Sequence, residues 1–177
     1  DEDNTISGNS GHNLIQGEDG VDKINAAGGN DTVEGGEGND VIKGQGGNDT
    51  LYGDNGNDQI TGGDGTDEMS GGAGNDKFIF GSAAEAGNGG SRDVIMDFEA
   101  VDVVNLRAID AVDGGSDNAF TFIATGAFTA AGQLRYFEDG FGNTIIEGNT
   151  DGNAATAEFQ IELRAYTGGL VINDLIL

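Results

Sequence analysis

The chain has no cysteine, no proline, no tryptophan and a single histidine among 177 residues. Without cysteine, it cannot form disulfides or thiolate zinc sites. A catalytic zinc ion typically needs three protein ligands, usually including two or more histidines or cysteines, so His12 alone cannot build one. No serine lies in a nucleophile elbow, which argues against a Ser-His-Asp triad. A glycosidase carboxylate pair remains open on composition alone, but we expect no enzyme activity of this chain.

Basic residues are also scarce, with 7 against 32 acidic residues and a formal net charge of −25. Only 36% of residues are hydrophobic, below the roughly 45–50% of ordinary globular domains. Such a chain cannot bury enough apolar surface to fold unless something neutralises its acids. The charge repels phosphate and anionic lipid, so we expect no nucleic-acid partner, and it attracts divalent cations. No apolar run approaches the length of a membrane span, so we expect no membrane insertion.

Glycine, by contrast, is abundant, with 34 residues, and much of it follows a nine-residue period from Gly8 to Ile79. Position four of all eight copies is glycine, position six is aspartate in all but the first, and position eight is always apolar. The copies begin at Gly8, Gly17, Ala26, Gly35, Gly44, Gly53, Gly62 and Gly71. The apolar position-eight residues are Ile15, Ile24, Val33, Ile42, Leu51, Ile60, Met69 and Phe78. An incomplete copy with Asn4 and Ile6 in phase precedes them.

Each position of the repeat has a physical reason. Glycine permits positive φ and close backbone approach, which a tight six-residue turn needs. The last three residues are polar, apolar and polar, typical of a short strand with one side chain facing inward. Two copies then complete one coil of a flattened solenoid, and the position-eight residues stack between two parallel sheets. The sequence therefore predicts an all-β fold, with a parallel β-roll over residues 1–80.

The position-six carboxylates predict calcium sites along both edges of this roll. Calcium takes six to eight oxygen ligands, including carboxylates and backbone carbonyls. Turns of copies two apart stack on the same edge, so each stacked pair can enclose an oxygen cage, and the geometry predicts about six ions. The position-six ligands are Asn13, Asp22, Asp31, Asp40, Asp49, Asp58, Asp67 and Asp76. The position-four ligands are Gly11, Gly20, Gly29, Gly38, Gly47, Gly56, Gly65 and Gly74, and those at position two are Gly36, Gln45, Asp54, Gly63 and Gly72. Neutral Asn13 should close its cage weakly.

These repeats resemble the RTX nonapeptide Gly-Gly-x-Gly-x-Asp-x-U-x, a calcium-binding β-roll motif. The resemblance covers residues 8–79 and departs from glycine at positions one and two in Ala26-Ala27, Gln45 and Asp54. Because those positions act through backbone carbonyls, we expect their cages to survive.

After Ile79 the period ends, and Gly81 to Ser91 is a polar connector. Alternating segments then predict strands over 93–98, 101–107, 119–125, 133–138, 143–147, 158–164 and 170–177. This half predicts a C-terminal β-sandwich-like domain over residues 81–177.

The second half resembles the C-terminal domain of serralysin-type secreted metalloproteases, a module also found behind other secreted hydrolases. The similar segments are Arg92 to Phe98, Ala127 to Tyr136 and Asn173 to Leu177. The resemblance implies an extra calcium, for about six to seven in all, held by Glu85, Asp93 and Asp102. It also implies an uncleaved type I secretion signal ending in Asp174-Leu175-Ile176-Leu177, although that tail is equally consistent with an edge strand.

The favoured function is a calcium-binding module that folds outside the cell and supports type I secretion and stability of a larger protein, such as a hydrolase. The opening residues Asp1 to Asn4 carry neither a basic nor an apolar stretch, so from them we expect no secretory leader. The expected partners are calcium, the type I secretion machinery and an N-terminal catalytic or adhesive domain of the same polypeptide. The alternative is a polysaccharide-binding module, like those of alginate epimerases, with a groove lined by Arg92, Arg107, Arg135 and Arg164. Pairing of these arginines with nearby acids is the simpler interpretation.

Overall fold

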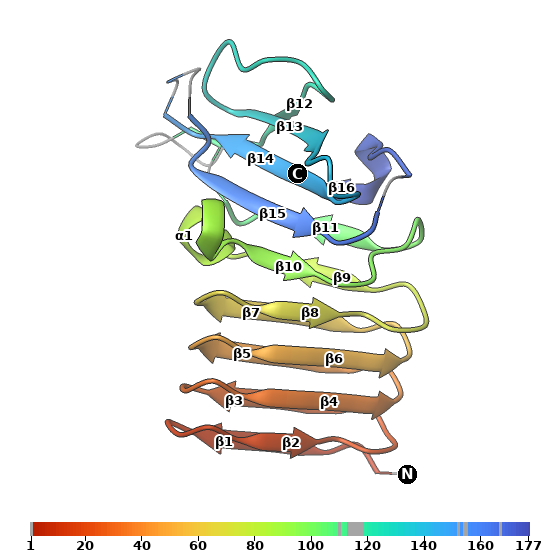
Figure 1. Ribbon diagram of the computed structural model, residues 1–177. Coiled ribbons are helices and arrows are strands. Elements are labelled where there is room, and N and C mark those ends of the chain that lie inside the picture. Colours follow the sequence, from red (N-terminus) through yellow and green to blue (C-terminus); the bar gives the residue numbers. More distant parts are fainter. Residues whose placement is uncertain (1, 110, 113–118, 152, 154–155, 167) are drawn as a thin grey trace.

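The chain winds into a tall stack of flat coils, and the strands of these coils form two facing sheets. The N-terminus lies at one end of the stack (Figure 1). A computed structural model describes residues 2–109, 111–112, 119–151, 153, 156–166 and 168–177. Along the repeats, successive strands fall alternately in the two sheets, as the nine-residue period predicts. The parallel β-roll is confirmed.

The first sheet has seven strands, all paired in parallel. In spatial order they are β1 (Thr5–Asn9), β3 (Lys23–Ala27), β5 (Val41–Gly46), β7 (Gln59–Asp64), β9 (Lys77–Ile79), β11 (Val103–Asn105) and β16 (Leu175–Ile176).

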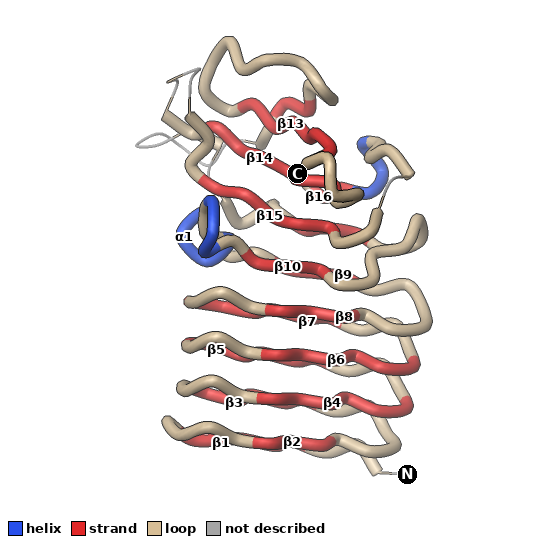
Figure 2. Tube along the Cα trace, viewed as in Figure 1, coloured by secondary structure: helices blue, strands red, loops and turns tan. Residues whose placement is uncertain are grey.

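The second sheet has nine strands, antiparallel only where β14 meets its two neighbours. In spatial order they are β2 (Leu14–Gln16), β4 (Thr32–Glu37), β6 (Thr50–Asn55), β8 (Glu68–Ser70), β10 (Asp93–Ile95), β15 (Phe159–Leu163), β14 (Thr144–Asn149), β13 (Gln133–Glu138) and β12 (Thr121–Phe122). Figure 2 shows strands and turns alternating in every coil of the roll, with longer loops only toward the C-terminal end.

The core is a single layer of side chains, contributed by both sheets and buried between them. Register pairs Ile24 with Ile42 and Leu51 with Met69, so two copies complete each coil. From Val33 to Phe78 every position-eight side chain is completely buried. One apolar side chain per strand makes a thin core, because the outward faces of the strands contribute nothing to it.

Both sheets continue across the boundary predicted at residue 80. β10 and β15 extend the second sheet, and β11 and β16 extend the first. The strands of the C-terminal half therefore continue the sheets of the roll rather than forming sheets of their own. Phe98, Phe120 and Phe159 thicken the core there.

Several elements of the C-terminal half differ from the prediction. The connector contains a short helix, α1 (Ala83–Ala86), and a 3-10 turn, η1 (Gly89–Ser91), because Ser82 accepts the Glu85 N–H and so caps α1. The predicted strand 119–125 is reduced to β12, and 170–177 begins with the 3-10 turn η2 (Ile172–Asp174).

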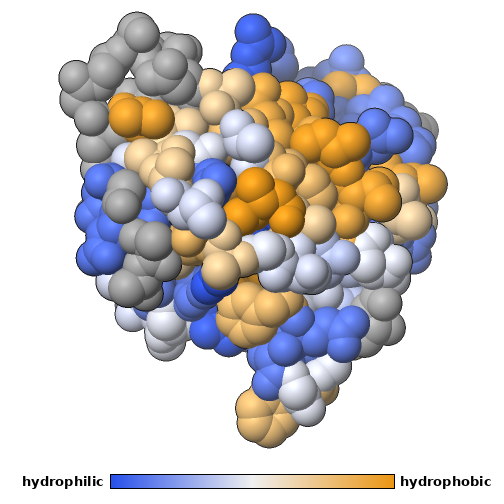
Figure 3. Space-filling view, turned by 90° about the horizontal axis from the view of Figure 1, so that it is seen from above, coloured by the Kyte–Doolittle hydropathy of each residue, from blue (hydrophilic) through white to orange (hydrophobic). Residues whose placement is uncertain are grey.

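The C-terminal end of the stack, viewed in Figure 3, gathers apolar residues in one region. Phe137, Val171 and Ile172 are among the exposed large apolar residues of this half. Among the described residues, no helix is long and apolar enough to cross a membrane.

Candidate metal centre

The position-six aspartates lie inside the turns at the two edges of the roll, and each is at most 2% exposed. One carboxylate oxygen, Oδ1, accepts the backbone N–H of the position-six residue one coil earlier. The Asp40 N–H, for example, donates to Asp58 Oδ1 at 2.8 Å. These contacts link residues 18 apart and build two columns of acids, one along each edge.

We call these the first and second columns. The first column contains Asp22, Asp40, Asp58, Asp76 and Asp102, and the second contains Asp31, Asp49, Asp67 and Asp93. Adjacent copies lie at opposite edges, so the two columns are separate.

The other carboxylate oxygen, Oδ2, is buried without a hydrogen-bond donor in eight aspartates. They are Asp22, Asp31, Asp40, Asp49, Asp58, Asp67, Asp76 and Asp93. A buried, unpaired carboxylate oxygen is strongly unfavourable unless a cation or a donor meets it. The same unmet need recurs at position six of every copy from Asp22 to Asp76 and again at Asp93.

Carbonyl oxygens converge on the same places. A Cβ on Gly35 would lie 2.5 Å from Asp40 Oδ2 and 2.7 Å from the carbonyl oxygen of Gly53 in the next coil. The space beside Gly35 is therefore enclosed by oxygens that carry no hydrogen, which suits a hard cation such as calcium. Within the described residues, no three acidic or histidine side chains converge on one point, so a cation here depends on backbone carbonyls.

The predicted carbonyl donors have the backbone that the turn requires. Position-two residues have positive φ, from 71° at Asp54 and 78° at Gln45 to 107° at Gly36. Position-four glycines from Gly20 to Gly74 all have φ between 112° and 148°. Gly11 is outside this group. His12 is exposed, with Nδ1 2.9 Å from the Asn30 carbonyl oxygen.

Burial raises the pKa of the carboxyl groups from Asp40 upward in the two columns, because desolvation disfavours the charged form and the stacked acids repel one another. The pKa is raised to about 7 in Asp58 and Asp67 and to about 8 in Asp93. Backbone N–H donors oppose the shift in each case. Without cations, Asp58, Asp67 and Asp93 therefore hold protons at a pH where ordinary aspartates are ionised.

Glu85, Asp93 and Asp102 do not come together. Asp93 Oδ1 accepts the Asp67 N–H and Asp102 Oδ1 accepts the Asp76 N–H, so these two acids extend different columns. Glu85 lies at the edge of the second column, where it raises the pKa of Asp93 and lines a small cavity with Asp64. The structure thus places Glu85 near the column of Asp93 and sets Asp102 in the other column.

The connector explains why the period seemed to stop. Ladder contacts across it join residues 26 apart instead of 18, so it adds eight residues to one coil and phase then resumes. Asp93 and Ile95 occupy positions six and eight of a further copy, and Asp102 and Val104 those of the next. Their nine-residue separation was the sequence signal for this restart.

Two acids at the end of the first column were missed. The Asp97 carboxylate accepts the N–H groups of Gly71 and Gly72, each at 3.0 Å. Asp97 and Glu99 both raise the pKa of Asp76 through charge repulsion. Asp97 falls at position one of a degenerate copy, where the motif predicts glycine, and so offered no signal.

Three of the four arginines form ion pairs with acids of the fold, as the simpler interpretation expected. Arg92 pairs with Glu162 at 2.6 Å and Arg135 with Glu147 at 2.7 Å. Arg164 lies 3.5 Å from Glu68 and 3.6 Å from Glu162. Three of the four arginines are therefore neutralised within the fold.

Residues 1–78 match the model of the RTX calcium-binding nonapeptide repeat, over 1–33, 26–60 and 44–78. The chain carries RTX repeats. These repeats bind Ca²⁺, form a non-catalytic module and are typical of extracellular proteins. No curated protein sequence matches the chain at a significant level.

Solved structures with RTX-type rolls share the fold of this chain. The AlgE6R3 subunit of the Azotobacter vinelandii mannuronan C5-epimerase is 21% identical with a TM-score of 0.55, covering 99% of this chain and 78% of that one. The AlgE6R2 subunit of the same epimerase is 20% identical with a TM-score of 0.57, covering 98% and 91%.

Proposed function

We propose that this RTX module is a calcium-dependent folding switch that supports type I secretion and extracellular stability of a larger protein, such as a hydrolase. The observation that carries the proposal is the set of eight buried carboxylate oxygens without donors. When bound, calcium supplies the positive charge that these oxygens lack. The two columns then have four such positions each, two more than the repeat geometry alone predicted.

The thin core makes folding depend on those positions. In calcium-poor cytosol the net charge of −25 and the stacked acids oppose the coil, which leaves the chain extended for export. Outside the cell, metal-binding free energy becomes folding free energy. Affinities of roughly 10⁻⁴–10⁻³ M per site, as in other extracellular modules, are sufficient for this.

The end of the chain fits such a switch. Leu175 pairs with Val104 in the first sheet, and Asp174 accepts the Val171 N–H at 2.8 Å. In the folded chain the tail is thus an edge strand. We propose that the export machinery reads it before the roll forms.

The test is circular dichroism of chelator-treated protein during calcium titration, with magnesium as the control. We expect a cooperative gain of β signal with calcium and none with magnesium. A spectrum already β-rich without calcium, and unchanged by it, would contradict the switch and favour a static binding module.

A second candidate function is binding of an anionic extracellular polysaccharide, with lysines in place of the arginines predicted from sequence. All three lysines, Lys23, Lys43 and Lys77, lie on the outward face of the first sheet. Positions seven and nine of the repeats in this sheet carry no acid, although exposed Asp64 ends β7, whereas the second sheet presents Glu34 and Glu68 at these positions. Fold similarity to mannuronan epimerase subunits is consistent with this candidate.

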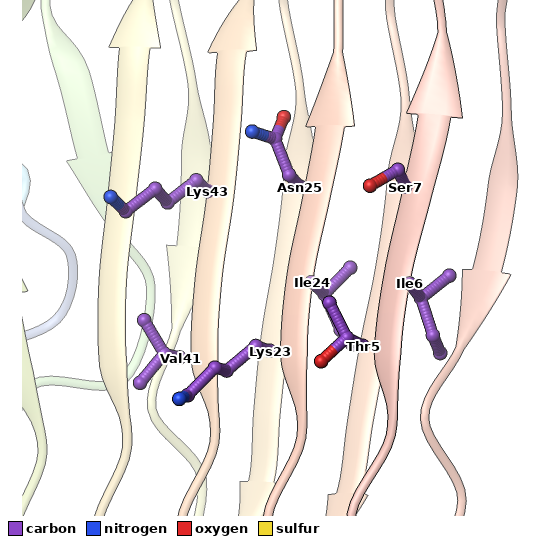
Figure 4. A pocket seen from close by; sticks show the side chains of 8 residues that line it. All are labelled: Thr5, Ile6, Ser7, Lys23, Ile24, Asn25, Val41 and Lys43. Carbon is purple, nitrogen blue, oxygen red and sulfur yellow. The ribbon is translucent and has the colours of Figure 1, made fainter.

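Lys23 and Lys43 line a shallow groove of about 300 Å³ with Asn25, Thr5 and Ser7 (Figure 4). At saturating calcium, polymannuronate should bind the parent chain, and the Lys23→Gln/Lys43→Gln variant should bind at least tenfold more weakly. Neutral dextran is the control ligand. Equal affinity of parent and variant would remove this candidate.

A further inference from the structure

The first turn of the second column is closed differently from the turns above it. Asn13 occupies position six, and its amide Nδ2 donates to the Gly11 carbonyl oxygen at 2.8 Å. Its Oδ1 accepts the Asn9 N–H at 2.8 Å. One neutral side chain therefore satisfies both the position-four carbonyl and its own oxygen. In the later turns an aspartate has no hydrogen to donate, and its Oδ2 remains without a partner.

The backbone of this turn differs as well. In later copies positions two and four have positive φ. Asn9 and Gly11, at those positions in the first copy, do not. Instead the Gly11 N–H donates to Asn9 Oδ1 at 2.9 Å, so the turn is held by its own side chains.

Asn4 repeats the arrangement at the first column. Its amide donates to the carbonyl oxygen of Glu2, two residues earlier, just as Asn13 donates to Gly11. Both asparagines also donate their backbone N–H into the ladder, to Asp22 and Asp31 respectively. The same solution at two separate edges shows a common role.

We propose that Asn4 and Asn13 are cation-free plugs, which close the first turn of each column with amide hydrogens where later turns need calcium. The inference rests on the proposed calcium binding and places the first ions beside Asp22 and Asp31. Aspartate at residue 13 would set a carboxylate oxygen against the Gly11 carbonyl oxygen, a repulsive contact without a cation.

Asn13→Ala and Asn13→Asp in the full chain test the plug. Bound calcium is counted by equilibrium dialysis at saturating concentration, and thermal unfolding is measured in metal-depleted buffer. We expect Asn13→Ala to bind as many ions as the parent chain. We expect Asn13→Asp to bind one more and to melt at lower temperature without metal. Asn25→Asp, an exposed strand residue, is the control for added charge.

Loss of one ion in Asn13→Ala would show that Asn13 is a ligand and overturn the proposal. An unchanged ion count in Asn13→Asp would overturn it too. Because Asn13→Ala adds no charge, its count remains decisive if Asn13→Asp fails to fold. A parent chain that binds no calcium contradicts the proposed function itself, whatever the variants do.

Discussion

At the scale of single residues, the two carboxylate oxygens of each position-six aspartate have different surroundings. Oδ1 of Asp58 accepts the Asp40 N–H of the preceding coil, whereas Oδ2 is buried without a donor, and we propose that it meets a cation. Aspartate is the shortest side chain that can do both. Spacing alone predicted these acids as ligands, but the different roles of their two oxygens follow only from the three-dimensional structure.

Replacing Asp58 by asparagine should separate the two roles. The Oδ1 hydrogen bond can remain, while the charge that attracts calcium is lost. At 10 mM calcium we expect a loss of about 1.5–3 kcal/mol, the linkage contribution of one site with affinity of roughly 10⁻⁴–10⁻³ M. Denaturant unfolding with and without calcium measures this, with exposed Asp19→Asn as control. A similar loss in metal-depleted buffer would contradict the division of roles.

Gly56 and Gly46 form a matched pair for the close approach of successive turns. Gly56 has φ of 147°, and a Cβ there would lie 1.6 Å from the Gly38 carbonyl oxygen. A Cβ added to Gly46 would have no neighbouring atom within 4 Å. We expect Gly56→Ala to lower the free energy of unfolding by about 3 kcal/mol or more, and Gly46→Ala to change it by less than about 1 kcal/mol. If Gly56→Ala and Gly46→Ala lowered the free energy of unfolding equally in calcium-saturated melts, this explanation would be wrong.

At the scale of elements, the stacked acids couple folding to pH. Asp58 and Asp67 have pKa values of about 7 and Asp93 about 8 in the fold, against roughly 3.9 when unfolded. The metal-free native chain then binds more protons than the unfolded chain, so its stability is greatest below about pH 4 and is lost as pH rises toward 8.

We therefore expect metal-depleted protein to melt at higher temperature at pH 5 than at pH 8. Protons compete with calcium for the same carboxylates, so the calcium midpoint should be higher at pH 5. Melting curves in buffers depleted of metal, followed by calcium titrations at both pH values, check both signs. Greater metal-free stability at pH 8 would contradict the burial of unneutralised acids.

Periodicity predicted the elements of the roll well, because each position has a fixed physical task. It failed for residues whose hydrogen bonds are not part of the nine-residue repeat. Asp97 replaces a glycine and binds two backbone N–H groups, and Ser82 caps a helix of four residues. Neither residue recurs at the nine-residue spacing. The restart at Asp93 and Asp102 was hidden because an insertion of eight residues breaks the phase, although each acid keeps its position relative to an inward apolar residue.

At the scale of the whole molecule, the C-terminal half completes the roll. Val104 pairs with Phe78 in the first sheet, and Ile95 pairs with Met69 in the second. The last repeat coil would otherwise present its apolar core and two open strand edges to water.

A chain ending at residue 80 should therefore need more calcium to fold than the full chain. Such a chain loses Asp93 and Asp102, the acceptors for Asp67 and Asp76. We expect its calcium midpoint in circular dichroism to rise several-fold and its transition to broaden. Residues 1–107, which keep both acceptors, should fall between the two. Equal midpoints for 1–80 and the full chain would show that the roll is independent of residues 81–177.

The hydrogen bonds of the two columns all point the same way, since each acid holds the coil before it and none holds the coil after it. The stack therefore has a direction of growth. The position-six N–H of a coil finds its acceptor only when the following coil presents its carboxylate, so we expect ordering to begin at the C-terminal end and to spread toward Asn4. A chain that emerges from a pore tail first would meet calcium in the order in which its coils can be secured, and each finished coil would hinder backward sliding.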